Sequence, residues 1–328
     1  MLTYRATLRP RSATRSPWQA DTLFGHLCWL IRYEEGAAAL DDVLAHYRRG
    51  APPLLLSDGF PNGWLPRPLL PDMRPRERGD KRTQVAALEA AKEAEGIRWV
   101  GLADFDALRR GSTAIPVAWP ALDPTRTVLK NQINRLTGST TPSDETAQGG
   151  SLYDVDELAF VDATSVRRAG LDVTVYVRSA DERWAGRAKD LLGRLARGGY
   201  GAKKSAGYGH FDLAGWQRFD GFDAPPEGAN GFISLSNWVP ARTDPTTGYY
   251  GTMVKYGKLG EELANAENPF KFPLTMLAAG SVFYANAPIR DWYGRLVEGI
   301  APAEPRVVQY GYAFAVSTRL VSEGDHDS

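Results

Sequence analysis

Strand-like and helix-like patterns follow one another along the first two thirds of this chain, and their order restricts the possible folds more than any other feature. Residues 4–8 alternate apolar with polar side chains, which is the period of a strand with one buried face. A helical pattern follows, which begins at Ser16 or near Asp21 and ends at Gly36. A second helical pattern covers residues 40–47. This part of the chain is therefore expected to form one strand followed by helices.

Later patterns complete a repeated unit. Residues 153–160 and then residues 173–177 have the alternation of strands. The apolar spacing over 184–195 predicts an amphipathic helix, and residues 211–213 follow as a strand. With the intervening residues set aside, the order is strand, helix, strand, strand, helix, strand. This order is typical of the ferredoxin-like, or RRM-like, α+β fold, a split βαβ repeat.

The length and the breaks in the pattern predict two domains. A chain of 328 residues corresponds to roughly two domains of about 150 residues. We expect an N-terminal domain at 1–218, with an irregular insertion at about 51–150 that is rich in proline, glycine and polar residues. Residues 220–230 have the composition of a linker, and a smaller C-terminal α+β domain is expected at 219–328. Its clearest strand covers residues 308–317.

Basic and acidic residues are segregated along the chain, although 39 Lys and Arg balance 39 Asp and Glu. Residues 1–20 hold four arginines and no acid, and residues 124–143 and 191–211 hold further unopposed basic residues. Acids gather between residues 144 and 162. Neutral net charge is unfavourable for a nucleic-acid binder, but this segregation can still give one positive face to an anionic ligand.

Cysteine usage limits the chemistry. The single cysteine, Cys28, can form neither an intrachain disulfide nor a thiolate metal cage. We therefore expect no metal and no cofactor. The sequence shows no secretion signal and no apolar run suited to a membrane span, so we expect a cytoplasmic protein that does not contact membranes.

The glycine-rich segment Gly198–Gly209 is the strongest candidate site. Its glycines permit positive φ and close approach of a ligand to backbone N–H groups, while Lys203 and Lys204 add charge and Ser205 adds a hydroxyl. It lacks the glycine pattern of a Walker A loop and follows a helix, where a Walker A loop would open one. Phosphate binding is therefore the favoured interpretation, and a simple helix-to-strand turn is the alternative.

Two histidines and an acidic stretch are weaker candidates. His26 or His210 could be the general acid or base of a metal-independent ribonuclease, although isolated histidines are usually structural. Asp154, Asp156 and Glu157 could ligate a divalent ion, but such acids more often form a solvated face or a docking site for a partner protein.

Four passages, taken together, resemble the RAMP superfamily of CRISPR proteins. They are residues 20–27 (ADTLFGHL), residues 54–61 (LLLSDGFP) with 65–68 (LPRP), residues 130–138 (KNQINRLTG) leading to 150–153 (GSLY), and residues 198–211 (GGYGAKKSAGYGHF). The set is similar to the subunit that caps the 5′ tag of crRNA in type III-A (Csm) effector complexes. The resemblance covers most of residues 1–215, with a weaker C-terminal part at 279–283 (AGSVF) and 310–312 (YGY).

The resemblance implies tandem ferredoxin-like domains, with a thumb-like insertion between the first helix and the second strand. It implies a non-catalytic subunit whose glycine-rich loop grips the repeat-derived 5′ tag. The implied partners are the crRNA, a large polymerase-type signalling subunit, a backbone RAMP subunit and, indirectly, target RNA. The acidic stretch could then contact a protein.

The charges and the resemblance together define the expected RNA-binding residues, among which Tyr200 and Tyr208 could stack on splayed bases. The full set is Gly198, Gly199, Tyr200, Gly201, Ala202, Lys203, Lys204, Ser205, Ala206, Gly207, Tyr208, Lys130, Asn131, Asn134, Arg135, Arg9, Arg11, Arg15 and His26. Two alternatives remain open. One is an endoribonuclease that processes CRISPR repeat RNA with His26 as general acid or base, and the other is an assembly module whose RNA contact is incidental.

Overall fold

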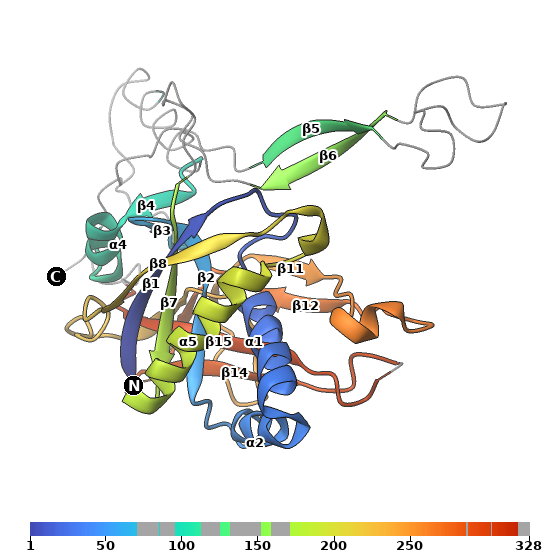
Figure 1. Cartoon of the computed structure of the whole chain (residues 1–328). Coiled ribbons are helices and arrows are strands. Elements are labelled where there is room, and N and C mark those ends of the chain that lie inside the picture. Colours follow the sequence, from blue (N-terminus) through green and yellow to red (C-terminus); the bar gives the residue numbers. More distant parts are fainter. Residues whose placement is uncertain are drawn as a thin grey trace, which may run out of the picture.

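The computed structural model describes residues 1–70, 85, 96–112, 125–131, 152–158, 171–286, 288–302 and 304–320. Four antiparallel strands form the first sheet, in the order β2-β7-β1-β8 (Figure 1). They are β1 (Leu2–Pro10), β2 (Leu54–Pro61), β7 (Val173–Ser179) and β8 (Phe211–Arg218). No helix among these described residues is long and apolar enough to cross a membrane.

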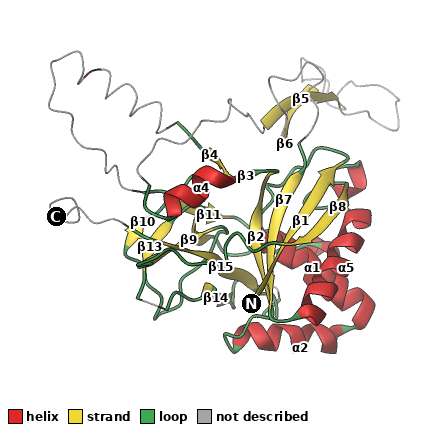
Figure 2. Ribbon diagram, turned by 90° about the vertical axis from the view of Figure 1, so that its left-hand side faces the viewer, coloured by secondary structure: helices red, strands yellow, loops and turns green. Residues whose placement is uncertain are grey.

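Three helices pack beside this sheet, and α1 and α5 cover one of its faces (Figure 2). They are α1 (Ala20–Glu35), α2 (Ala37–Arg48) and α5 (Glu182–Gly198). Helix α5 begins where the side chain of Asp181 accepts a hydrogen bond from the Trp184 N–H, an N-cap. Helix α1 has no cap of its own, and the Asp58 carboxylate of β2 instead accepts a hydrogen bond from the Ala20 N–H at 2.8 Å. A residue distant in sequence therefore fixes the start of α1.

The order β1, α1, β2, β7, α5, β8 is the expected β-α-β-β-α-β unit, but its second strand differs from the expectation. Residues 153–160 were expected to form that strand, whereas Leu54–Pro61 does. All eight residues of β2 are buried, so its sequence lacks the alternation that marks a strand with one exposed face. The expectation was therefore wrong for a physical reason.

The residues between β2 and β7 form the insertion, which follows the second strand and does not precede it. Its described elements are β3 (Trp64–Pro66), β4 (Trp99–Gly101), α4 (Leu102–Arg109), β5 (Thr125–Asn131) and β6 (Leu152–Leu158). Strands β5 and β6 pair with each other, and Leu158 bridges to Thr14 just after β1.

The C-terminal half contains a second antiparallel sheet, on the side of the first sheet away from α5 (Figure 2). Its order is β10 (Gly248–Tyr249), β13 (Val282–Tyr284), β9 (Gly231–Ser234), β15 (Gln309–Thr318) and β14 (Trp292–Val297). A separate ribbon pairs β11 (Thr252–Lys255) with β12 (Leu274–Leu277). The described residues after α5 form only the short 3-10 helices η1 (Lys204–Ala206) and η2 (Glu261–Asn265) and no further α-helix. A second ferredoxin-like unit is thus not seen among them.

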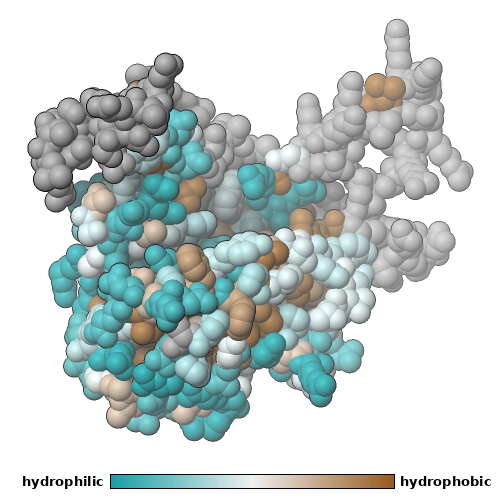
Figure 3. Space-filling model, turned by 90° about the vertical axis from the view of Figure 1, so that its right-hand side faces the viewer, coloured by the Kyte–Doolittle hydropathy of each residue, from teal (hydrophilic) through white to brown (hydrophobic). Residues whose placement is uncertain are grey.

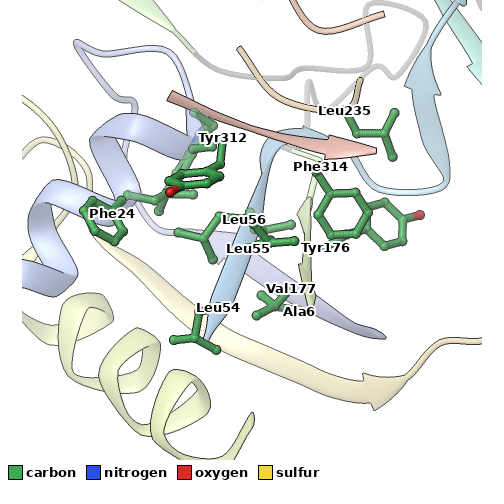
Figure 4. Packing of buried hydrophobic residues seen from close by; sticks show 14 of the residues in the cluster. Ala6, Phe24, Leu54, Leu55, Leu56, Tyr176, Val177, Leu235, Tyr312 and Phe314 are labelled. Carbon is green, nitrogen blue, oxygen red and sulfur yellow. The ribbon is translucent and has the colours of Figure 1, made fainter. Parts of the chain in front are cut away.

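One hydrophobic core joins the two halves. Leu54, Leu55 and Leu56 of β2 lie in the same cluster as Tyr312 and Phe314 of β15, and Figure 4 shows these side chains together. The Tyr312 hydroxyl donates to the Tyr47 carbonyl, and the Tyr310 hydroxyl accepts from the Leu56 N–H. The boundary expected near residue 218 is therefore not a gap in the packing.

Candidate functional site

A groove of about 920 Å³ runs along α1 and reaches α2. Its other walls are the glycine-rich segment Gly198–Gly209, residues 255–264 and residues 304–310. The N-terminal half thus supplies one wall and the C-terminal half supplies the other. Residues that are far apart in sequence meet here because the two halves share one core.

The base of the glycine-rich segment is held by hydrogen bonds from its own backbone. The Gly201 N–H donates to Nε2 of His26 at 2.9 Å, and the Ala202 N–H donates to Oγ of Ser16 at 3.1 Å. Gly209 has φ +74°, and a Cβ there would lie 1.9 Å from the Tyr200 carbonyl oxygen. Glycine is therefore required at this position by both conformation and space.

His26 supports the loop. Its Nε2 atom accepts a hydrogen bond from the loop and is therefore not available to a ligand. Burial, with a smaller contribution from the charge of Lys204, lowers the pKa of His26 to about 4. The ring is therefore neutral near pH 7, which is the form that can accept the Gly201 N–H. Sequence reasoning placed His26 at the site but not in this supporting role.

The expectation that Tyr200 and Tyr208 stack on bases was wrong, because both side chains are buried. Tyr200 stacks on Trp18 with ring centroids 4.2 Å apart, and its hydroxyl accepts from the Gln19 N–H. The Tyr208 hydroxyl donates to Glu157 at 2.6 Å. The two rings fill the space beneath the loop.

The tip of the segment, residues 202–207, remains largely exposed. Lys203 has φ +62°, a left-handed conformation that is uncommon for a residue with a Cβ. Its ammonium group forms no ion pair with a carboxylate in the described part of the chain. Lys204, by contrast, forms an ion pair across the groove with Glu261 of η2. The two neighbouring lysines therefore differ, since only Lys203 is available to an anion.

The N-terminal arginines are divided in the same way. Arg9 pairs with Asp172 and Arg11 pairs with Asp212, both at exposed positions. Arg15 lines the groove, and no carboxylate among the described residues lies within ion-pair distance of it. Of the three, only Arg15 lines the groove.

The expected basic residues of the insertion are only partly described. Lys130 lies 3.4 Å from Glu157 and 4.3 Å from the centroid of the Tyr208 ring, so it packs under the loop. Asn131 ends β5. Asn134 and Arg135 lie outside the described residues.

A polar network that sequence reasoning missed forms the floor of the groove. The buried carboxylate of Asp21 lies 2.9 Å from Nζ of Lys255 and accepts a hydrogen bond from the Gln309 amide. Lys271 donates to Gln309 at 2.8 Å, and burial lowers the pKa of Lys271 to about 8. These residues come from α1, β11, β15 and the segment before β12, so no local motif could reveal them.

The acidic residues of β6 differ in their surroundings. Asp154 and Asp156 are exposed, whereas Glu157 is buried against Lys130 and Tyr208. Across the residues with described positions, no group of three potential ligands among His, Cys, Asp and Glu is suited to a metal ion.

Comparisons with solved structures identify the fold. A chain of the Csm1–Csm4 cassette in complex with pppApA matches with a TM-score of 0.57 and 18% identity, over 98% of this chain and 100% of that chain. A chain of the Csm3–Csm4 subcomplex of the type III-A CRISPR-Cas interference complex matches with a TM-score of 0.61 and 10% identity, over 97% and 100%. Family models and curated protein sequences gave no match. This chain therefore shares its fold with chains of these two assemblies, which confirms the resemblance at the level of the fold.

Proposed function

We propose that this chain is an RNA-binding, non-catalytic subunit of a type III CRISPR effector complex. It grips the repeat-derived 5′ tag of the crRNA at the groove beside the glycine-rich segment. Its neighbours in the assembly are a large polymerase-type subunit and a backbone RAMP subunit, and through them it meets target RNA indirectly. The end-to-end likeness to chains from Csm1–Csm4 and Csm3–Csm4 assemblies supports these partners.

One observation carries the proposal: an exposed loop tip with an unpaired cation stands at the edge of a groove large enough for nucleotides. Lys203 lies at that tip, and Arg15 lines the same groove. Phosphate contacts from basic side chains supply most of the affinity for nucleic acids. Two such residues on one wall suit a single strand whose backbone follows the loop.

Cleavage is not part of the proposal, because the candidate general base is occupied. Nε2 of His26 accepts the Gly201 N–H, and the pKa of His26 is lowered to about 4. A general base works best with a pKa near the working pH. The processing nuclease therefore gains no support from the position of His26.

The test is to incubate the full chain, with EDTA present, with labelled repeat RNA and with mature guide RNA, following binding and cleavage together. Binding of the mature tag without cleavage is expected. Specific cleavage of the repeat that disappears in His26→Ala would replace this proposal with the nuclease. No binding to either RNA would favour an assembly module.

The assignment of Lys203 is tested by its salt dependence. Lys203→Ala should weaken tag binding and reduce the slope of log K against log salt by about 1, since one phosphate contact is lost. Lys189→Ala is a matched control, because Lys189 lies on α5 and does not line this groove. If both variants weaken tag binding equally, the affinity depends on the net charge of the protein and not on a phosphate contact of Lys203.

A further inference from the structure

The ribbon of β11 and β12 has one buried and one exposed face. Residues 252–258 alternate between exposed and partly buried positions along the chain. The inner face includes Met276, which is buried, and Met253, which packs against the same small cluster. Side chains of the outer face are therefore exposed to solvent.

The outer face carries three large aromatic residues. Tyr256 is 77% exposed, Phe270 is 61% exposed and Phe272 is 56% exposed. Gly257 and Lys271 pair through their backbones, which joins the two segments that carry these rings. None of the three rings is buried, so packing among the described residues does not account for them.

The aromatic face adjoins the groove described above. Tyr256 and Lys258 line the groove, and Nζ of Lys258 lies 5.9 Å from the centroid of the Phe270 ring. The loop tip with Lys203 belongs to the opposite wall. Figure 3 shows the side of the molecule that bears η2, where hydrophobic residues gather in small groups between hydrophilic ones. Tyr256 thus lines the groove together with Lys203 and Arg15, and Lys258 connects it to the Phe270 ring.

This combination fits a single-stranded nucleic acid better than a protein. Proteins that bind single strands pair a basic groove, which follows the phosphates, with aromatic rings on which bases stack. Lysines flank the rings here, and the exposed apolar groups are mainly aromatic. Since Tyr200 and Tyr208 are buried, the ribbon supplies the exposed rings beside the groove.

We infer that Tyr256, with Phe270 and Phe272, forms a platform on which bases of a single-stranded RNA stack while its phosphates contact Lys203 and Arg15. The inference rests on the proposed function and adds to it a second wall of the site, which comes from the C-terminal half. The platform recognises unpaired bases by their faces and therefore tolerates different sequences.

The experiment compares the full-length wild type with Tyr256→Ala, Phe270→Ala and Tyr250→Ala. The probe is a short single-stranded oligoadenylate that contains 2-aminopurine. Tyr250 is the matched control, since it is 50% exposed but lines no part of the groove. Tyr256→Ala should lower the affinity by about five- to a hundredfold and remove the quenching of 2-aminopurine, while the salt slope stays unchanged. Phe270→Ala should act in the same direction, and Tyr250→Ala should have no effect.

The outcomes separate this inference from the function on which it rests. If the wild type binds and Lys203→Ala weakens binding, but Tyr256→Ala and Phe270→Ala do not, the platform is wrong and the RNA-binding function stands. If Tyr256→Ala leaves RNA binding intact but weakens binding to a backbone RAMP subunit, the patch is a protein interface. If the wild type binds the mature guide RNA but not the oligonucleotide, the platform is overturned and the proposed function stands, whereas binding to neither overturns both.

Discussion

Gly209 is the residue at which the glycine-rich segment depends most on the absence of a side chain. Gly209→Ala should lower the free energy of unfolding by about 2–5 kcal/mol, because a positive φ and a Cβ clash with the Tyr200 carbonyl add together. Urea denaturation followed by circular dichroism measures the change. Gly198→Ala is the control, since no atom lies within 4 Å of its added Cβ, and it should change stability by less than about 0.5 kcal/mol. Equal effects of the two substitutions would contradict the required close approach.

Asp58 makes the stability of the folded protein depend on pH, and the direction of this dependence follows from its pKa. Burial is the main cause that raises the pKa of Asp58 to about 7. Between about pH 4 and pH 7, Asp58 is therefore protonated in the folded state and ionised in the unfolded state. Its contribution to stability is greatest below about pH 4 and declines as the pH rises to about 7. Asp58→Asn should remove this decline while keeping an acceptor for the Ala20 N–H. The test is to measure the free energy of unfolding of both proteins between pH 4 and 8. If it changes with pH in the same way for both, the raised pKa of Asp58 is contradicted.

Single residues also show where sequence reasoning reached its limit. Lys203 and Arg15 both line the groove, and their expected contact with RNA stays a prediction. Tyr200 and Tyr256 could not be ranked from sequence, because a tyrosine beside glycines gives no sign of whether its ring points inward. Burial, which decides between core and platform, depends on segments packed from elsewhere in the chain.

The ion pair between Lys204 and Glu261 links the glycine-rich segment to η2 across the groove. Glu261→Gln should release Lys204 for a phosphate and raise the RNA affinity a few-fold, since an exposed pair is worth about 0.2–1 kcal/mol. The salt slope should increase by about 1. Both quantities come from titrations at several salt concentrations.

Glu262→Gln is the matched control for this element. Glu262 lines the same groove, and no ion pair of its carboxylate is described. It changes the net charge equally without releasing Lys204. If both variants raise the affinity to the same extent, the effect is one of charge alone and the ion pair has no special role.

Elements with a single clear period were predictable, and fully buried ones were not. The spacing over 184–195 predicted α5, because one face of this helix is apolar and the other is charged. Strand β2 was not predicted, because both of its faces are buried and its sequence therefore lacks the alternation of apolar and polar residues. Strand β15 is also almost wholly buried, but its run of aromatics and small residues over ten positions marked it as a strand.

At the scale of the whole molecule, the shared core predicts one cooperative unfolding transition for the described parts of both halves. Phe314 of β15 packs with Tyr176 of β7, and Arg178 of β7 donates to the Ala315 carbonyl, so neither sheet can open alone without exposing the other. Calorimetry should give equal calorimetric and van't Hoff enthalpies. Tyr312→Phe should lower the whole transition, by about 1 kcal/mol, because it removes one buried hydrogen bond. Two separate transitions, with only one shifted, would disprove the shared core.

The network of Asp21, Lys255, Lys271 and Gln309 belongs to this same scale. Its members are separated by more than 200 positions in sequence between α1 and β11, and pattern analysis of neighbouring residues cannot pair them. Only the topology brings them together. The general class of fold was therefore predictable, whereas half of the groove was not.

Strand β15 is the last described strand of the chain, yet it fills the core beside α1 and β2. During translation, at about 5–20 residues per second, β2 leaves the ribosome on the order of tens of seconds before β15. Throughout that interval Leu55 and Leu56 have no partner for the surface that Tyr312 and Phe314 later cover. We therefore expect the nascent chain to pass through a stage with an exposed apolar surface, which lasts until β15 is synthesised and covers it.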